Sequence, residues 1–305
     1  MYKYLLMAAL ILTACNLFSP LEENQTSPSL EVEVSQTPAE AEGPEPAETI
    51  GIQVTNLPEN APSAFIIFNK YVNVFGVHIY ATGNVPDAKL LHAAAVMAEY
   101  LDNNEDGMPV NPLVVEAMQT NQATLIMFED EGEIERSGLF EADLPEGMIL
   151  QDLYAEETHP GGAEEGRFDA ALEEVLHLIT HAGYASAYPE VFGEQPGSKL
   201  ADAMDVARGG QFTRIPSNYP EEAWYTYDDP TCEYDCQVAE YIYWALTSLL
   251  GGQDFPGRLE EIEHEWRLNT PEKLQDGDVA VYALLTDGQY RLPTELPDGS
   301  YLGIP

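Results

Sequence analysis

Residues 168–183 read FDAALEEVLHLITHAG, and their apolar spacing predicts a helix that Gly183 ends. At about 100° per residue, this helix places His181 about 40° and Glu174 about 60° from His177. The three side chains therefore form one polar stripe on an otherwise apolar helix. A single histidine is usually a hydrogen-bonded core or surface residue, whereas two imidazoles four residues apart can share a metal ion. The stripe favours a metal site on this helix.

Residues 236–250 read CQVAEYIYWALTSLL and predict the most apolar helix of the chain. Glu240 is the one charged residue between positions 237 and 253. Burying a carboxylate in such surroundings costs free energy unless it is paired or bound to a cation. A zinc site needs a third protein ligand beside two histidines, and Glu240 is the best candidate for that ligand.

Two histidines on one helix and a glutamate on a later helix resemble the arrangement in gluzincin-type zinc metallopeptidases. Residues 240–244, EYIYW, also look like the Glu-aromatic helix of the lethal factor-like branch of that family. This resemblance covers the two helices. It implies a zincin-like fold, Zn²⁺ bound by His177, His181 and Glu240, and a protein or peptide as substrate.

The signature of that family, H-E-x-x-H, is incomplete in this chain. Leu178 follows His177, at the position of the glutamate that acts as general base for the zinc-bound water. Glu174 could replace that base, serve as a ligand, or only orient His177. A metal-binding relative without peptidase activity is the alternative that this departure leaves open. Further candidates, as donors to an oxyanion, are Tyr184, Tyr225 and Tyr227.

A second cation site is predicted in the loop over residues 102–113. Its first half, residues 102–107, reads DNNEDG and resembles the start of an EF-hand calcium loop. The expected Ca²⁺ ligands are the side chains of Asp102, Asn104 and Asp106 and the backbone carbonyl of Met108. Leu113 occupies the twelfth position, where a bidentate glutamate is usual, and Asn111 or Glu116 could substitute for it. The alternative is a solvated polar turn between two helices.

Cys232 and Cys236 flank three residues just before the apolar helix. Outside the cytoplasm two nearby thiols usually oxidise, so we expect a disulfide that fixes the start of the helix carrying Glu240. A metal-binding pair of cysteines is the alternative, although the sequence has no second pair to complete such a site.

The N-terminus has the features of a secretory signal. Lys3 precedes an apolar run from Leu5 to Leu12, which is too short to span a bilayer as a helix. The ending Leu-Thr-Ala-Cys resembles the lipobox of bacterial lipoproteins, in which the cysteine is acylated, so residues 1–14 are expected to be removed and Cys15 to carry lipid. A plain signal peptide with an incidental cysteine is the alternative. The resemblance implies an extracytoplasmic protein anchored to the membrane through its lipid.

Residues 15–50 are expected to form an extended spacer. They contain eight Glu and five Pro but no Lys or Arg, so they repel one another and have little apolar surface to bury. The whole chain has 53 acidic and 12 basic residues, and its formal charge of −41 excludes ordinary nucleic-acid binding, which needs clustered Lys and Arg. The 45% hydrophobic content excludes global disorder.

Residues 51–305 are expected to form a single zincin-like metal-binding domain of the α+β class, with a small early β-sheet followed by a mostly helical half. Strands are predicted over 73–82, 123–128 and 148–153. Further helices are predicted over 86–101, 111–119, 199–208, 257–267 and 278–285, beside those over 168–183 and 236–250.

Two functions follow from these residues. The first is a zinc-dependent hydrolase of the metallopeptidase type, with Zn²⁺ on His177, His181 and Glu240 and Glu174 as the candidate base. The second is a non-catalytic acidic surface lipoprotein whose metal sites, including calcium, are structural and which binds a partner. The absence of the usual base favours the second function, whereas the paired histidines and the isolated Glu240 favour a metal centre in both.

Overall fold

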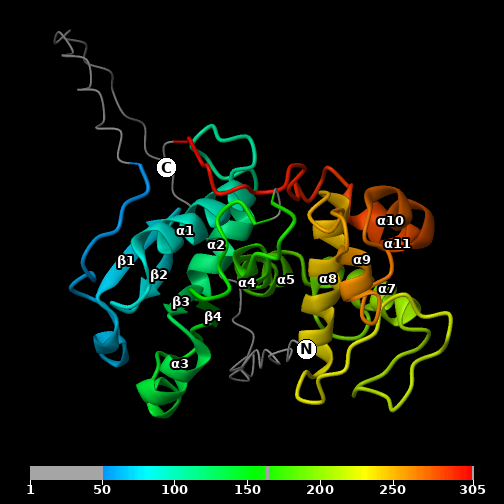
Figure 1. Ribbon diagram of the computed structural model, residues 1–305, viewed down its shortest axis with the longest axis horizontal. Helices are drawn as coiled ribbons and strands as arrows, with labels where there is room; N and C mark the ends of the chain where they lie inside the picture. Colours follow the sequence, from blue (N-terminus) through cyan, green and yellow to red (C-terminus); the bar gives the residue numbers. More distant parts are fainter. Residues whose placement is uncertain (1–50, 163–164, 304–305) are drawn as a thin grey trace, which may run out of the picture.

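The computed structural model describes residues 51–162 and 165–303. A four-stranded mixed sheet comes first along the chain and the remainder is largely helical, so the prediction of an α+β protein is confirmed (Figure 1). The predicted signal peptide, Cys15 and the acidic spacer lie outside the described residues. Within the described ranges, no helix combines the length and the apolar character that a bilayer-spanning segment requires.

The strands of the sheet follow one another in space in their order along the chain. They are β1 (Lys70–Val74), β2 (Val77–Ala81), β3 (Thr124–Phe128) and β4 (Leu150–Tyr154). β1 and β2 are antiparallel, whereas β2, β3 and β4 run parallel. Parallel neighbours need a long crossover, and helices lie between β2 and β3 and between β3 and β4.

The prediction of one strand over residues 73–82 is wrong, because the chain reverses in the middle of this stretch. Val74 pairs with Val77 across a two-residue turn made by Phe75 and Gly76. Both turn residues have positive φ, 49° and 84°, which two-residue hairpins require and which glycine adopts without a Cβ clash. Asn73 strengthens the turn, since its side-chain oxygen accepts a hydrogen bond from the Gly76 N–H at 3.0 Å.

The helices follow the predicted map in most places. In chain order they are α1 (Asp87–Leu101), α2 (Pro112–Thr120), α3 (Glu131–Ser137), α4 (Ala170–Leu178), α5 (Ala185–Ala187), α6 (Pro189–Phe192), α7 (Lys199–Ala207), α8 (Tyr234–Leu249), α9 (Arg258–Ile262), α10 (Pro271–Gly277) and α11 (Val279–Leu285). The sequence pattern missed α3, α5, α6 and α10, and it extended α9 beyond its end at Ile262. Two short 3₁₀ helices, Ser63–Ile67 and Leu139–Glu141, and one π-helical turn, Ile179–Tyr184, complete the described elements.

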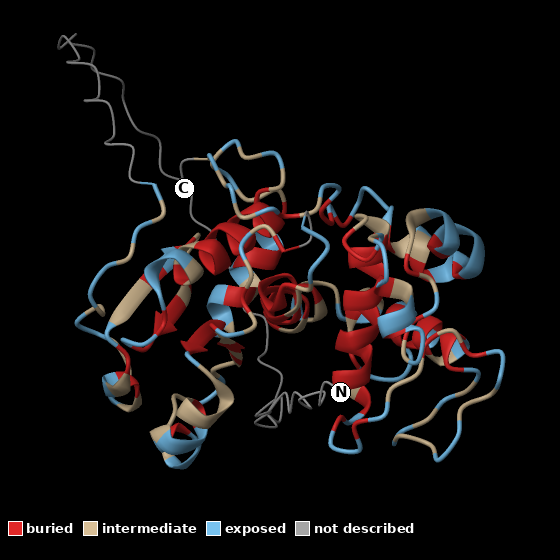
Figure 2. Ribbon diagram, in the orientation of Figure 1, coloured by how far each residue is buried: buried red, intermediate tan, exposed pale blue. Residues whose placement is uncertain are grey.

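Helices α4 and α8 lie at the centre of the molecule. Figure 1 shows the sheet with α1 and α2 on one side of them and α7 and α9 to α11 on the other. Both central helices are buried along almost their whole length, as the red ribbons in Figure 2 show. The sheet buries both of its faces. One face packs Ile79 and Met127 into the main core, and the other packs Tyr80 and Phe128 against Phe65.

The helix that carries the paired histidines does not end at Gly183. Beyond Leu178 it widens into a π-helical turn, Ile179–Tyr184, and then continues into α5. A Cβ atom on Gly183 would lie 2.7 Å from Cγ1 of Val114 in α2, so glycine is required here for the close approach of two helices. At its other end α4 is capped by Asp169, whose side chain accepts a hydrogen bond from the Ala171 N–H at 3.2 Å.

Candidate metal centre

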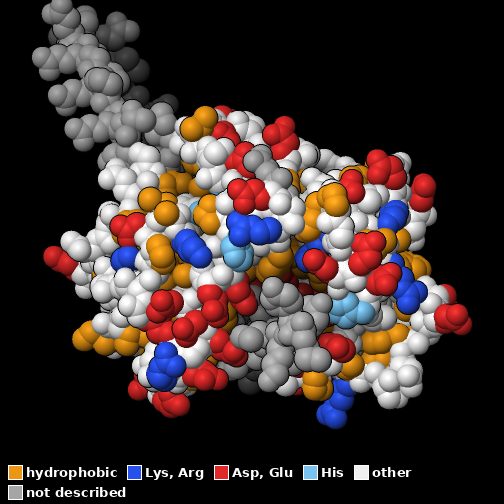
Figure 3. Space-filling view, viewed as in Figure 1, with side chains coloured by type: hydrophobic (Ala, Val, Ile, Leu, Met, Phe, Trp, Pro, Cys, Tyr) orange, Lys and Arg blue, Asp and Glu red, His pale blue; other side chains and the backbone are white. Residues whose placement is uncertain are grey.

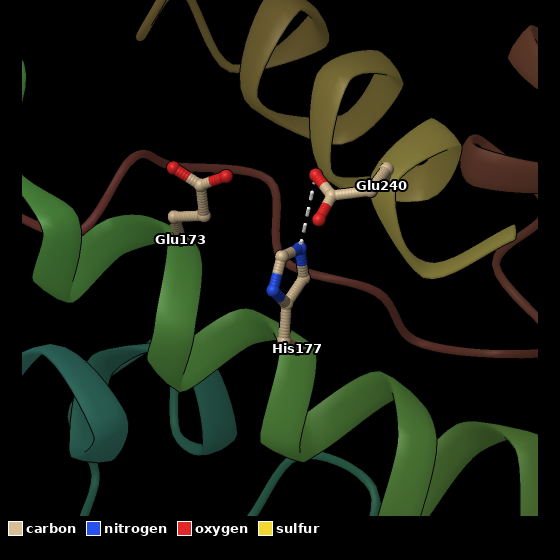
Figure 4. Close-up of side chains that lie close together, drawn as sticks. All are labelled: Glu173, His177 and Glu240. Atoms are coloured by element: carbon tan, nitrogen blue, oxygen red, sulfur yellow. Dashed lines mark ion pairs between the residues drawn. The ribbon is translucent and has the colours of Figure 1, made fainter. Parts of the chain in front are cut away.

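Glu173, His177 and Glu240 bring three possible ligand atoms within 4.8 Å of one another, and this group could bind a metal ion. Glu173 and His177 lie one turn apart on α4, and Glu240 faces them from α8 (Figure 4). The His177 Nε2 atom lies 3.7 Å from Oε2 of Glu240. Neighbouring ligands around a tetrahedral zinc ion are about 3.3–3.5 Å apart, so the His177–Glu240 pair is close to the spacing that a shared ion requires.

The His177 ring is held between two carboxylates. Its Nδ1 atom faces Oε2 of Glu174 at 3.6 Å, while its Nε2 atom faces Glu240. Glu174 is held in turn by Gln151 on β4, whose Nε2 donates a hydrogen bond of 2.6 Å to the same Oε2. Nε2 of His177 is buried and has no hydrogen-bond partner among the described residues. A buried polar atom without a partner is costly, and an ion at this position would satisfy it.

The electrostatics of the group favour a cation. Burial raises the pKa of Glu240 to about 8; the nearby His177 opposes this rise, and the negative charges of Glu173, Glu174 and Glu265 add to it. Burial also raises the pKa of Glu173 well above its ordinary value, with Glu174 adding to the rise and Arg258 opposing it. A divalent ion would compensate these carboxylates where the protein itself supplies few positive charges.

Burial likewise raises the pKa of Glu174 well above its ordinary value. Asp152 and Glu157 add to the rise through their charges, and the hydrogen bond from Gln151 opposes it. Because this carboxyl group contacts Nδ1 and not Nε2 of His177, it lies on the far side of the imidazole from the candidate metal position. That placement matches the usual position of a residue that orients a histidine ligand.

Two tyrosines complete the surroundings. The Tyr227 hydroxyl donates a hydrogen bond of 3.3 Å to Oε1 of Glu240, so one of the three tyrosines singled out from the sequence lies at this group. Tyr184 and Tyr225 do not, because their hydroxyls donate to the backbone carbonyls of Arg291 and Gln237. Tyr243, one turn beyond Glu240 on α8, packs edge-on against the His177 ring at 5.6 Å between centroids.

His181, the other expected zinc ligand, is not part of the close group. Its Nδ1 atom is hydrogen-bonded to Oε2 of Glu194, which lies in the connection between α6 and α7. Sequence spacing could not identify this competitor, because Glu194 has no periodic relation to the histidine pair. Two of the three expected ligands, His177 and Glu240, therefore converge, and the third atom of the group comes from Glu173. The helical geometry held a signal for Glu173, since it precedes His177 by four residues and is as close in angle as His181.

The predicted calcium loop is closed by hydrogen bonds to its own backbone and to the C-terminal segment. Asp102 is fully buried and accepts hydrogen bonds from the Gly107 N–H at 2.8 Å and from the Tyr301 hydroxyl at 2.7 Å. Asn104 donates to Asp106 at 2.8 Å, and Met108 is exposed. Calcium at this loop remains a prediction.

The two proposed substitutes for the twelfth loop position, Asn111 and Glu116, both have clear locations. The Asn111 side chain donates to the Tyr290 carbonyl at 2.7 Å and so is directed toward the C-terminal segment. Glu116 is exposed on α2. Neither side chain is held at the loop.

Cys232 and Cys236 are joined in a disulfide, as expected from their spacing. The bond closes a tight loop that ends in the first turn of α8, the helix that carries Glu240. Cys15, the expected site of lipidation, is outside the described residues.

The chain matches no protein-family model, no curated protein and no solved structure.

Proposed function

We propose that this protein is a lipid-anchored, extracytoplasmic metalloprotein in which Glu173, His177 and Glu240 bind one divalent cation. The observation that carries the proposal is the buried Nε2 atom of His177, which lacks a partner and lies 3.7 Å from a buried carboxylate. Zn²⁺ is the ion that we propose, because imidazole and carboxylate ligands at tetrahedral distances suit it.

The proposed location rests on the lipobox-like ending at Cys15 and on the acidic character of the folded part. Residues 51–305 contain 45 acidic and 11 basic residues, and Figure 3 shows carboxylates spread over much of the visible face. Such a surface is repelled by anionic lipid, so membrane attachment would come from the acyl chains on Cys15. The loop over 102–113 is proposed as a second, structural cation site for Ca²⁺.

The second candidate function is hydrolysis by a zincin-like centre. It is favoured by the pairing of His177 on α4 with Glu240 on α8, the two-helix arrangement that the gluzincin resemblance implies. In this candidate Glu174 orients His177 and does not act as the base, because its carboxylate contacts Nδ1. A peptide library digested with and without chelator separates a peptidase from a non-catalytic metalloprotein.

Metal analysis and calorimetry test the principal proposal. The purified full-length protein is stripped with a chelator and titrated with Zn²⁺, Ca²⁺ and Mg²⁺. We expect one tightly bound Zn²⁺ per chain, lost in His177→Ala and Glu240→Gln. Glu190→Gln is the matched control, because Glu190 is exposed on α6 and does not belong to the metal-binding group.

Two results would overturn the proposal. One is the absence of Zn²⁺ binding in the unsubstituted protein. The other is equal Zn²⁺ affinity in Glu240→Gln and in Glu190→Gln, which would place the ion elsewhere.

A further inference from the structure

A small cavity lies between α4 and α8, next to the metal-binding group. Its apolar walls come from Ile149, Leu150, Leu178 and Ala239, and Gln151 adds an amide. The remaining lining residues are His177, His181, Cys236 and Glu240. Each of these four side chains belongs to a residue type that binds transition metals.

These four residues form two pairs with the same spacing. His177 and His181 are four residues apart on α4 and its π-helical continuation. Cys236 and Glu240 are four residues apart on α8. Residues at this spacing share a helix face, so two potential ligands from each helix border one enclosed space.

Three of the four side chains have an atom available for a metal in this cavity. Nε2 of His177 is unpartnered among the described residues. His181 uses Nδ1 in its bond to Glu194, which leaves Nε2, and a carboxylate on Nδ1 is the usual way to orient a metal-binding imidazole. Glu240 contributes its carboxylate. The sulfur of Cys236 is occupied by its bond to Cys232.

We propose that Cys236 is a redox-controlled metal ligand: when the disulfide is reduced, its thiolate joins His177, His181 and Glu240 around one Zn²⁺ ion in this cavity. The proposal rests on the proposed metal centre and adds its regulation. In the oxidised protein the ion is held by Glu173, His177 and Glu240, whereas in the reduced protein a sulfur ligand is gained and the ion moves toward His181.

The chemistry balances with a dithiol as the reducing partner. The dithiol transfers two electrons and two protons to the Cys232–Cys236 bond, which yields two cysteine thiols and the cyclic disulfide of the reductant. Binding of Zn²⁺ then displaces the proton of the Cys236 thiol to solvent. Thiolate, imidazole and carboxylate together form a four-ligand set that zinc accepts.

The chain provides a matched pair of variants for the test. Cys232→Ser frees Cys236, which lines the cavity, and Cys236→Ser frees Cys232, which is not among its lining residues. Each variant lacks the disulfide and keeps one cysteine of the pair, with Cys15 common to both, so the loss of the crosslink affects both alike. Co²⁺ is the probe, because a cobalt–thiolate bond gives a charge-transfer absorption band that oxygen and nitrogen ligands do not give.

We expect the charge-transfer band with one equivalent of Co²⁺ in Cys232→Ser and not in Cys236→Ser. The unsubstituted protein should show the band after reduction by a phosphine, which is itself oxidised and does not compete for the metal as a dithiol does. Zn²⁺ should displace Co²⁺, with an apparent affinity that rises about tenfold or more on reduction. Replacing His181 by Ala in Cys232→Ser should weaken Co²⁺ binding while leaving the protein folded.

A band in both Cys→Ser variants, or in neither of them and not in the reduced protein, would overturn the proposal. Its failure is distinguishable from failure of the proposed metal centre. If oxidised protein binds Zn²⁺ through His177 and Glu240 but no band appears on reduction, only the redox control is wrong. If oxidised protein binds no Zn²⁺, the metal centre itself is wrong, whatever the cobalt spectrum of the reduced protein.

Discussion

Nε2 of His177 lies 3.7 Å from Oε2 of Glu240, across the interface between the two most buried helices of the protein. This distance is too long for a hydrogen bond and is close to the separation of two ligands on one metal ion. The two residues are 63 positions apart in the sequence, so the contact depends on the packing of α4 against α8. A partnerless imidazole atom beside a buried carboxylate is the feature from which the metal-dependent predictions follow.

Glu240→Gln should stabilise the metal-free protein and abolish its stabilisation by Zn²⁺. The amide keeps the shape of the side chain and removes a buried acid with a pKa of about 8, for a gain on the order of 1–3 kcal/mol near neutral pH. Zn²⁺ at about 100 times its dissociation constant adds roughly 2.7 kcal/mol to a protein that binds it. Urea denaturation with and without Zn²⁺ measures both effects, and an unchanged response to Zn²⁺ in the variant would contradict the expectation.

The metal-free protein should lose stability as the pH rises from about 4.5 to about 8. The pKa of Glu240 is raised from its ordinary 4.5, so the folded state binds this proton more tightly than the unfolded state does. The stabilisation is therefore fully present below about 4.5 and is lost as the pH rises through about 8. A Zn²⁺-loaded sample should show a smaller loss, because the metal replaces the proton. Denaturation of both samples at a series of pH values across this range measures the free energy of unfolding. An equal dependence of that free energy on pH in the two samples would contradict the prediction.

Glu194→Gln should lower the pKa of His181. Burial alone lowers this pKa, but the hydrogen bond and charge of Glu194, helped by Asp235, outweigh burial and raise it above 6.5. The pair therefore contributes stability that is fully present below about 6.5 and is lost as the pH rises through the folded-state pKa. NMR titration of the His181 ring protons measures the change, and the exposed Glu190→Gln variant is the control. An unchanged His181 titration in Glu194→Gln would show that the bond to Glu194 does not determine it.

Gly183→Ala should destabilise the protein by about 1–2 kcal/mol, although alanine is the better helix former. The new Cβ would lie 2.7 Å from Cγ1 of Val114 and 3.0 Å from Cγ of Met118. Gly288→Ala is the matched control, because a Cβ there meets nothing within 4 Å. Thermal unfolding of both variants provides the comparison. Equal midpoints would show that α2 can move away from the new Cβ with no loss of stability.

Calcium should raise the thermal midpoint of the protein, and Asn104→Ala should reduce that rise. Asn104 is a suitable target because its side chain is exposed and its hydrogen bond is local, to Asp106 at 2.8 Å. Asp102 is less suitable, since it is buried and accepts hydrogen bonds from the Gly107 N–H and the Tyr301 hydroxyl, which its replacement would also remove. A calcium titration that leaves the midpoint unchanged would refute the calcium loop.

Helical periodicity was most informative for α4 and α8, because a long apolar pattern with helical spacing is compatible only with a buried helix. It placed His177 and Glu240 on buried helices and so predicted two members of the metal-binding group. It could not determine which carboxylates compete for each imidazole. Glu194, which lies in a loop, is hydrogen-bonded to His181. Glu173, and not Glu174, is the third member of the metal-binding group. These outcomes depend on tertiary packing, which the spacing of residues along one helix does not determine.

The early strands show a different limit. Residues 73–82 have the alternation and β-branched content of a strand on both sides of Phe75-Gly76, and the turn between them is only two residues long. A pattern search averages over so short an interruption. The glycine at position 76 was the available signal in the sequence, because glycine readily adopts the positive φ that the turn has there. The turn forms despite the β propensity of the residues around it.

Gly183 places α2 directly against the continuation of the helix that carries His177. Since α2 begins where the predicted calcium loop ends, packed helices form a continuous connection between that loop and the metal-binding group. Thermodynamic linkage makes any such connection reciprocal. By whatever factor calcium at the loop strengthens zinc binding at His177, zinc must strengthen calcium binding equally. Two ions coupled in this way would be effectors of each other.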